Sequence, residues 1–485
     1  MTRRVVDREG WLAAAQGGRL VALWGTDRGA EGFAVCAAYG AAQGLDWVEL
    51  PLGAATRYPD LSRRFPCAAR MQRAIRDLLG LDAEGAEDAR PWLDHGAWTR
   101  RWPLRESQVE LPQRDPADYP FVRVEGEGVH EIPVGPVHAG IIEPGHFRFS
   151  IVGEKVLRLE QRLGYAHKGI ERRFTELAPL EAHRLAGRVS GDTTVAYAWA
   201  YCAALESACA ARVPERAAWL RALLLERERV ANHLGDLGAL GNDAGLAVGL
   251  AQFSRLREDW LRTSGEAFGH RLTMDAVCPG GVASDVSRAS LKKIGEDCER
   301  LERELAALRA LYDEHAGLQD RFVTTGRATP QLAARLGLTG LAGRASGQAL
   351  DLRCDHPVPP YDSLGVRKVV HRNGDVAARV LVRFDETVES LRLIRAICDG
   401  LPPGAVRSAL RVHDARAFGA GWIEGWRGEV LIALELEAGR IRRCHAHDPS
   451  WQNWPVLEHA VIGNIVPDFP LINKSFNLSY SGHDL

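Results

Sequence analysis

A helical apolar stripe in the second half of the chain most constrains its fold. Apolar residues at 291, 294, 298, 301, 305 and 308 step by three and four, as one face of an α-helix requires. The same spacing recurs at Leu220, Leu223, Val230, Leu234 and Leu237. Two long amphipathic helices indicate that this part of the chain is mainly helical.

The first part of the chain has the pattern of a small α/β module. Short apolar strands are predicted at 21–24, 33–36 and 46–51, followed by a helix over 70–79 that Gly80 ends. Further strands are predicted at 121–124, 131–134, 147–152 and 376–384. The predicted fold class is α+β, with a small α/β domain over residues 1–115, a Pro-rich, charged linker over 116–130 and a large, mainly helical domain with small β-sheet elements over 131–485.

Composition excludes several classes of protein. The 485 residues carry a net charge of −2, so no overall field attracts nucleic acid. No long uncharged apolar stretch predicts a transmembrane segment, and the polar start does not resemble a signal peptide. The nine cysteines are scattered without a Cys-x-x-Cys pair, which favours a reducing cytoplasmic compartment and no internal iron–sulfur cluster. No G-x-G-x-x-G follows a strand, so NAD binding by this chain is not expected.

Ordered motifs along the chain carry a family resemblance. Phe65-Pro66 followed by residues 76–81 resembles the complex I subunit that sits beside the quinone-site subunit in the peripheral arm. The later motifs resemble the large subunit of energy-converting, complex-I-like nickel–iron hydrogenases and the complex I quinone-site subunit itself. In those hydrogenases the two parts are commonly fused in this order. The later motifs are Gly135–His138 with Glu143–Arg148, Gly164–Glu171, Glu228–Leu234, Asn242–Gly245, and Gly343–Gly347 with Asp351–Arg353 and Pro360–Asp362.

Four positions depart from the hydrogenase pattern. Where the family carries two Cys-x-x-Cys motifs that hold the metal pair, this chain has Ser190, Thr193, Ser479 and Gly482. Nickel and iron in such a site need soft thiolates, whereas serine and threonine hydroxyls stay protonated near neutral pH. The resemblance therefore implies the energy-converting hydrogenase-related type, with the cysteine ligands lost and no metal bound. A simpler interpretation of Ser190–Thr193 is a helix start, since these residues favour caps.

The resemblance also implies two catalytic residues. In complex I, a histidine on the opening β-hairpin lies at the quinone headgroup and pairs with an aspartate, and the matching positions here are His146 and Asp243. A carboxylate beside an imidazole fixes its tautomer and raises its pKa, so it can deliver a proton to a reduced quinone oxygen. The second quinone ligand, a tyrosine, aligns near Gly191 and is absent. Alternatively, His146 braces the hairpin and Asp243 is a turn residue.

Two further sets of residues keep open interpretations. Arg344, Arg353, Arg379 and Arg383 either line a polar path or interface, as the resemblance implies, or lie on the solvated surface. The cluster Cys444-His445-Ala446-His447 suggests a metal site only weakly, and packing is the stronger interpretation.

The resemblance as a whole implies a cytoplasmic subunit attached to the inner face of the cell membrane through partner subunits. An iron–sulfur small subunit and antiporter-like membrane subunits are the expected partners. Electrons would pass between the partner's cluster and a quinone-type carrier, and NAD would act only at the level of the whole complex. The alternatives are a catalytically silent scaffold and, more weakly, a hydrogenase with atypical ligands.

Overall fold

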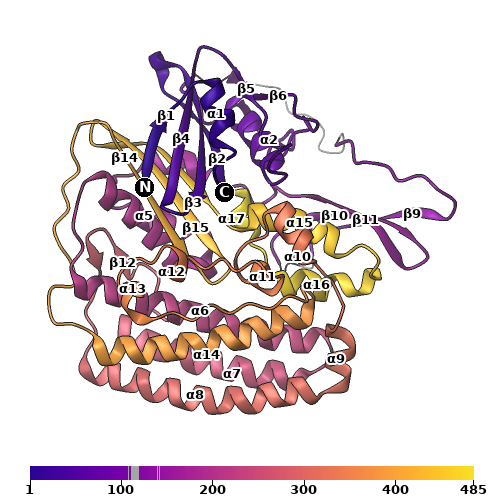
Figure 1. Ribbon diagram of the computed structural model, residues 1–485, viewed down its shortest axis with the longest axis vertical. Coiled ribbons are helices and arrows are strands. Elements are labelled where there is room, and N and C mark those ends of the chain that lie inside the picture. The colour runs from indigo at the N-terminus through magenta and orange to yellow at the C-terminus, as the bar shows by residue number, and fades with distance from the viewer. Residues whose placement is uncertain (108, 111–118, 139, 141) are drawn as a thin grey trace.

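The N-terminal part of the computed structural model is a four-stranded sheet with the strand order β1-β4-β3-β2 (Figure 1). The structure describes residues 1–107, 109–110, 119–138, 140 and 142–485. All three strands predicted for this part are confirmed, and so is the helix that Gly80 ends in a left-handed conformation. The elements are β1 (Thr2–Val5), α1 (Arg8–Ala14), β2 (Arg19–Asp27), β3 (Phe33–Ala41), β4 (Gly44–Gly53), β5 (Arg57–Pro59), α2 (Ala68–Leu79) and β6 (Asp82–Glu84).

The segment after this sheet forms little regular structure. Short strands β7 (Arg100–Arg101) and β8 (Val109–Glu110) pair with each other. Residues 116–118 of the predicted linker lie outside the described residues. The strand predicted at 121–124 is wrong, because the backbone N–H of Val122 donates to the Glu160 carboxylate, at 2.8 Å, instead of to a neighbouring strand.

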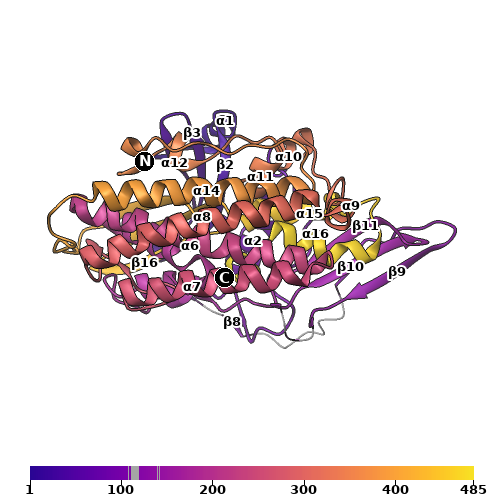
Figure 2. The ribbon, with the colours of Figure 1, turned by 90° about the horizontal axis from the view of Figure 1, so that it is seen from below.

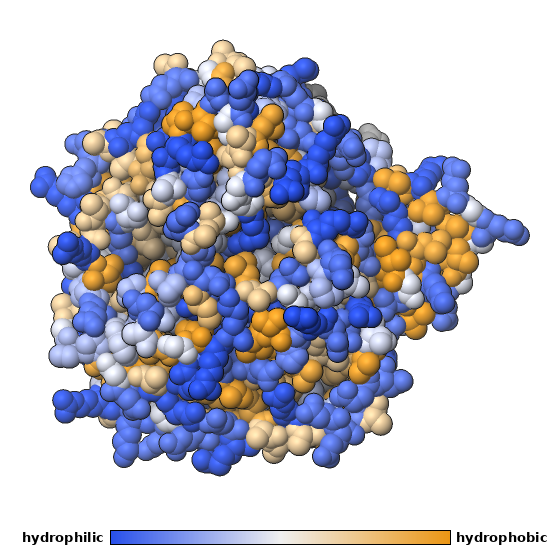
Figure 3. All heavy atoms as spheres, viewed as in Figure 1, coloured by the Kyte–Doolittle hydropathy of each residue, from blue (hydrophilic) through white to orange (hydrophobic). Residues whose placement is uncertain are grey.

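A three-stranded antiparallel sheet projects from the body of the molecule (Figure 1). It consists of β9 (Val129–Val134), β10 (His146–Val152) and β11 (Lys155–Arg162), with β10 in the centre. Both strands predicted here are confirmed. Apolar residues gather on the visible face of this projection (Figure 3), and the exposed apolar side chains of the sheet include Val152 and Leu157.

Four long helices lie side by side and form the large helical layer (Figures 1 and 2). They are α6 (Glu215–Asp243), α7 (Ala247–Phe268), α8 (Arg288–Glu314) and α14 (Val376–Gly400). Both leucine-rich helices predicted from the sequence are confirmed as α6 and α8. The strand predicted at 376–384 is wrong, since it is the first part of α14. Val376, Val380 and Phe384 lie four residues apart and pack into the core as one helical face.

Helix α5 (Thr194–Ala208) packs on a C-terminal antiparallel sheet of β14 (Ala417–Glu424), β15 (Glu429–Glu437) and β16 (Arg440–His447). Glycine is needed in β14, because a Cβ at Gly421 would lie 1.9 Å from the carbonyl oxygen of Ala200. On its other side this sheet meets the N-terminal sheet, where Trp47 packs edge-on against Phe418. One hydrophobic core cluster includes residues from both parts of the chain. The α+β fold class is confirmed.

Short helices connect these layers and bring the C-terminal end beside the N-terminal sheet (Figure 1). Among the described residues, no helix combines the length and the apolar character that crossing a bilayer requires. The connecting elements are α3 (Ile170–Phe174), α4 (His183–Ala186), η3 (Gly191–Thr193), β12 (Val277–Cys278), β13 (Gly281–Val282), α9 (Ala316–Phe322), α10 (Pro330–Leu336), α11 (Gly340–Ala345), α12 (Leu352–Asp355), α13 (Tyr361–Leu364), α15 (Ser450–Ala460), α16 (Phe469–Phe476) and α17 (Tyr480–Asp484).

Candidate functional site

The fold brings the two cysteine-free motifs into direct contact. Ser190 precedes η3 and Ser479 precedes α17, and their hydroxyl oxygens lie 2.9 Å apart in a buried hydrogen bond. The two residues are 289 positions apart in the chain. Motifs that the sequence shows only as separate stretches therefore form one site.

The remaining two positions of the motifs are tied into the same site. Thr193 Oγ1 donates to Asp192 at 3.0 Å. Ser479 caps α17, because its hydroxyl oxygen accepts the backbone N–H of Gly482 at 2.8 Å. A Cβ on Gly482 would lie 2.5 Å from Asp448 Oδ2, so the site leaves no room there for any side chain.

An ion pair that sequence reasoning missed lies at the centre of the site. The Arg427 guanidinium, from the turn between β14 and β15, binds Asp192 Oδ2 at 2.6 Å, and its Nη1 donates to Thr193 Oγ1 at 3.0 Å. Burial alone would raise the pKa of Asp192, but Arg427 and the two neighbouring hydroxyls hold it below its usual value. A fixed positive charge thus lies against the hydroxyl cluster. No spacing pattern along the chain marks Arg427.

The projecting sheet meets this site through the turn before β10. The Glu143 carboxylate accepts the backbone N–H of Ser481 at 3.1 Å, and a Cβ on Gly145 would lie 2.7 Å from the ring of Tyr480. The turn that carries His146 is therefore packed directly against α17 and its motif.

His146 is held by one ring nitrogen and leaves the other without a partner. Its Nδ1 lies 3.2 Å from the carbonyl oxygen of Gly135, which can only accept, so Nδ1 carries the hydrogen. Its Nε2 is buried and has no hydrogen-bond partner among the described residues. Burial lowers the pKa of His146 below its usual value, so the neutral ring presents a lone pair on Nε2.

The expected pairing of His146 with Asp243 differs from the structure. Asp243 ends α6 and forms an ion pair with Lys474 of α16 at 2.6 Å, and no hydrogen bond joins it to His146 among the described residues. The predicted rise in the pKa of His146 is therefore wrong for this chain, since burial lowers that pKa and no carboxylate among the described residues opposes it. Catalytic roles for the two residues stay predictions.

The four arginines singled out in the sequence are all buried, so the solvated-surface interpretation is wrong. Arg344 binds Glu386 at 2.6 Å and Glu424 at 2.7 Å. Arg353 binds Glu226 and Asp351, and Arg383 binds Asp236. Arg379 instead donates to Ser475 Oγ and two backbone carbonyls, and burial lowers its pKa to about 9. These arginines hold α6, α11, α12 and α14 together from inside.

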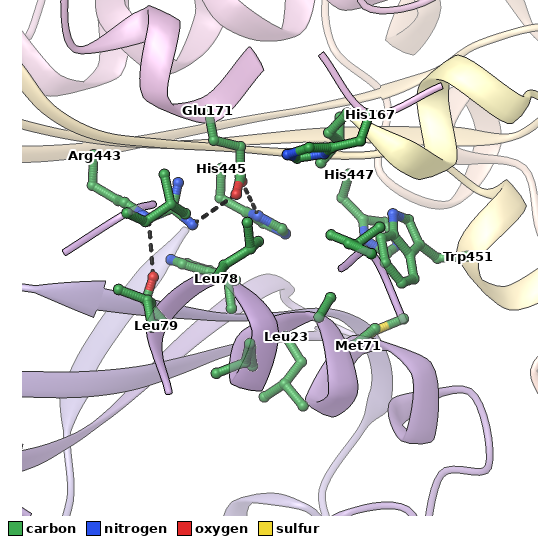
Figure 4. Close-up of a pocket in the computed structure, with 17 residues that line it drawn as sticks. Leu23, Met71, Leu78, Leu79, His167, Glu171, Arg443, His445, His447 and Trp451 are labelled. Carbon is green, nitrogen blue, oxygen red and sulfur yellow. Dashed lines mark hydrogen bonds and ion pairs between the residues drawn. The ribbon is translucent and has the colours of Figure 1, made fainter. Parts of the chain in front are cut away.

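A cavity lies away from the two motifs, at the seam between α2, β2 and β16 (Figure 4). Glu171 binds both Arg443, at 3.0 Å, and His445 Nδ1, at 2.6 Å. Leucines and Met71 make up half of the remaining lining residues. Cys444 points to the opposite face of β16 from His445, and no cluster among the described residues has three side chains placed to hold a metal ion.

Comparisons with known proteins place the chain among respiratory oxidoreductase subunits. The profile of the family described as the 30 kDa subunit of respiratory-chain NADH dehydrogenase matches residues 10–113, and that of the 49 kDa subunit matches residues 243–417. Formate hydrogenlyase subunit 5 of Escherichia coli is 31% identical over 88% of this chain and 77% of its own length. The carbon monoxide-induced hydrogenase of Rhodospirillum rubrum is 30% identical over 72% of this chain and 97% of its own length.

Similarity extends to quinone oxidoreductases and to a solved structure. The C/D subunit of the NADH-quinone oxidoreductase of Phocaeicola vulgatus is 27% identical over 79% of this chain and 78% of its own length. A chain of the membrane-bound sulfane sulfur reductase, an archaeal respiratory membrane complex, superposes with a TM-score of 0.69 at 24% identity, covering 74% of this chain and 99% of that one. The last comparison supports the fold alone.

Proposed function

Because this chain belongs to the family in which complex I 30 kDa-type and 49 kDa-type subunits are fused, we propose that it forms the redox cavity of a membrane-associated oxidoreductase without a nickel–iron centre. The substrate of that cavity is a quinone-type electron carrier. The buried contact of the Ser190 and Ser479 hydroxyls carries this proposal, because it lies where a metal pair would need thiolates.

The residues at the four motif positions do not fit a nickel–iron pair. Three of them supply hydroxyls already used in hydrogen bonds, and the fourth has no side chain. The Arg427 guanidinium binds Thr193 Oγ1 and Asp192 in the same cluster, so these oxygens already have a partner. Asp448 also occupies the position that a side chain at Gly482 would need. A hydrogenase with atypical ligands is therefore the weakest alternative.

His146 is the proposed proton donor and acceptor for the quinone. Its Nδ1–H is fixed on Gly135, so protons enter and leave at Nε2, the unpartnered atom. A reduced quinone oxygen needs a proton for each electron that it accepts, and an imidazole can take up and release a proton at one ring nitrogen. Asp243, held by Lys474 at the end of α6, is the second proposed proton-handling group in the assembled cavity.

The proposed partners follow from the relatives. The relatives include a numbered subunit of formate hydrogenlyase and a lettered component of hydrogenase-4, names that describe parts of larger assemblies. We therefore place this chain beside an iron–sulfur small subunit that supplies the electrons, and beside antiporter-like membrane subunits on the inner face of the cell membrane. The exposed apolar side chains of the projecting sheet support docking to a partner. NAD acts only at the level of the whole complex.

The test compares His146→Ala with His130→Ala in the purified complex. His130 lies on β9 of the same sheet and is exposed, and its Nδ1 lies 3.3 Å from the Gly128 carbonyl oxygen, so it is a matched control. Reduction of a soluble quinone analogue is expected to fall by about 10²- to 10⁴-fold in His146→Ala and to stay near wild type in His130→Ala. Equal activity in both variants would refute the role of His146 and favour a silent scaffold.

A further inference from the structure

A polar cavity that the proposed reaction does not use opens beside the hydroxyl cluster. It lies between η3, α6, α7 and the loop after α7, and both Asp192 and Glu228 line it. The Asp192 side chain is 39% exposed, although its carboxylate also binds the buried Arg427. The cavity therefore connects the outside of this chain with the former cysteine positions.

Unpartnered polar atoms in the cavity indicate that it is hydrated. Thr194 Oγ1 and Arg227 Nη1 both belong to lining residues that are almost fully buried, and neither has a hydrogen-bond partner among the described residues. Buried polar groups without a protein partner are usually satisfied by water. The space holds about one water molecule, and the carboxylates of Asp192 and Glu228 give that water further partners.

Glu228 differs from the other buried glutamates that surround it. Its carboxyl oxygens accept the backbone N–H groups of Val195 at 2.6 Å and Ala196 at 3.3 Å, at the start of α5. No arginine, lysine or histidine forms an ion pair with it among the described residues. Burial raises the pKa of Glu228 to about 8, which these two hydrogen bonds only partly oppose.

The charged groups around Glu228 come from every element packed against it. Arg227 and Arg229 lie on its own helix, Asp192 on η3, Arg257 on α7 and Arg271 on the loop after α7. Arg229 stabilises the charged form of Glu228, whereas Asp192 destabilises it. Glu228 is therefore a buried acid whose raised pKa favours the protonated form at neutral pH, and it lines the polar cavity.

Two consecutive hydrogen bonds lead from Asp192, at this cavity, to the hydroxyl of Ser479. Asp192 Oδ1 accepts from Ser190 Oγ at 2.9 Å, and Ser190 Oγ meets Ser479 Oγ at 2.9 Å. Ser479 caps the helix whose first turn contacts Glu143 and Gly145, immediately before His146. Hydroxyls can both donate and accept, which thiolates bound to metal cannot.

We propose that the cavity at Glu228, together with Asp192 and the hydroxyls of Ser190 and Ser479, forms a proton path that supplies the quinone site. The path rests on the proposed function. Each quinone takes up two electrons from the partner's iron–sulfur cluster and two protons to become a quinol. His146 delivers one of these protons to the quinone. The other moves from the Glu228 carboxyl through a water molecule in the cavity to Asp192, along the hydroxyls of Ser190 and Ser479 and on to the quinone, and solvent then reprotonates His146 and Glu228. The residues that replaced the thiolates thereby gain a role of their own.

The first test uses Glu228→Gln, an isosteric change, and Glu228→Asp in the purified complex. Reduction of a soluble quinone analogue is expected to fall at least about tenfold in Glu228→Gln and to recover in part in Glu228→Asp. Ser479→Ala, which breaks the hydroxyl chain, is expected to lower turnover similarly. Glu296→Gln is the control, because Glu296 is an exposed residue of α8 that pairs with Lys292 and is not among the residues lining the cavity. Wild-type turnover in Glu228→Gln would overturn the proposal.

A second readout does not depend on quinone turnover. A protonated Glu228 gives an infrared carbonyl band that is expected to shift in D₂O, to disappear in Glu228→Gln and to persist in Ser479→Ala. A band that does not shift in D₂O, or that survives in Glu228→Gln, would overturn the proton path. If the wild-type complex reduces no quinone while these infrared results hold, the proposed substrate fails and the proton-carrying site stands.

Discussion

Two buried glutamates, Glu171 at the seam of the N-terminal sheet and Glu228 beside the hydroxyl cluster, meet opposite electrostatic surroundings. Glu171 binds the guanidinium of Arg443 and the ring of His445, which overcome the cost of burial and lower its pKa to about 2 (Figure 4). Glu228 instead accepts two backbone N–H groups, and burial raises its pKa to about 8. The partner of a buried carboxyl group therefore decides whether it fixes structure or carries a proton.

The same contrast separates the helical layer from the site. In the helical layer, Arg344, Arg353 and Arg383 all bind buried carboxylates, so their charges are neutralised locally. In the site, one ring nitrogen of His146 and the carboxyl of Glu228 have no charged partner within the part of the chain that the structure describes. Groups left in this state cost stability, which proteins tolerate mainly where function needs them.

The largest expected effect is on stability at the seam. Glu171→Gln leaves the Arg443 guanidinium buried beside a neutral group, and breaking a buried ion pair in this way typically costs about 3–5 kcal/mol. The thermal unfolding temperature of the complex is expected to fall markedly. A variant as stable as wild type would show that the charge of Glu171 does not stabilise the contact with Arg443 and His445.

The next largest expected effect is the loss of stability when a methyl group is added at Gly482. Gly482→Ala places a methyl group 2.5 Å from Asp448 Oδ2, and overpacking of a filled site costs about 1–3 kcal/mol. Gly295→Ala on α8 meets no neighbouring atom and serves as the control. Equal thermal stability of the 482 and 295 variants would contradict the tight closure around Gly482.

The two glutamates are expected to give opposite dependences of stability on pH. Glu228 keeps its proton longer in the folded state, so its contribution falls as pH rises from about 4.5 to about 8, by at most about 1.4 kcal/mol per unit. Glu171 loses its proton more readily when folded, so its contribution falls as pH drops from about 4.5 to about 2. Unfolding measured across both windows in the two Gln variants checks each slope, and slopes unchanged from wild type would refute the assignment.

The smallest expected effect is on the stability of Glu228→Gln at about pH 4, where the Glu228 carboxyl is mostly protonated in the unfolded protein as well as in the folded one. The carboxyl is already neutral there, and a Gln oxygen can accept the same N–H groups of Val195 and Ala196. The free energy of unfolding is expected to change by less than about 1 kcal/mol. A loss as large as that of Glu171→Gln would mean that Glu228 is charged and structural, and the comparison between the two would fail.

Much of the fold could be predicted because its apolar patterns have clear periods. The leucine spacing of α8 and the short apolar strands of the N-terminal sheet correspond to elements with one face in the core. The prediction failed at α14, where Arg379, Arg383 and Glu386 are buried among valines. A helix buried on most of its surface shows no polar face, and β-branched residues then resemble a strand.

The site could be predicted only in part. The motifs located Ser190 and Ser479, but their 2.9 Å contact depends on the folding together of distant segments. Arg427 and Asp192 were missed because an ion pair between remote positions leaves no spacing pattern. Glu228 did carry a signal, since residues 226–229 are four charges inside a helix with apolar residues on both sides, so some of them had to be buried.

The central claim is that hydroxyl groups, and not a nickel–iron centre, occupy the place where the two motifs contact each other, and that the cavity there reduces a quinone. The most direct measurement combines metal content with reduction of a quinone analogue on one sample of the purified complex. The account predicts iron from the partner's cluster, nickel far below one atom per chain, and quinone reduction. One nickel atom per chain with hydrogen evolution would contradict it.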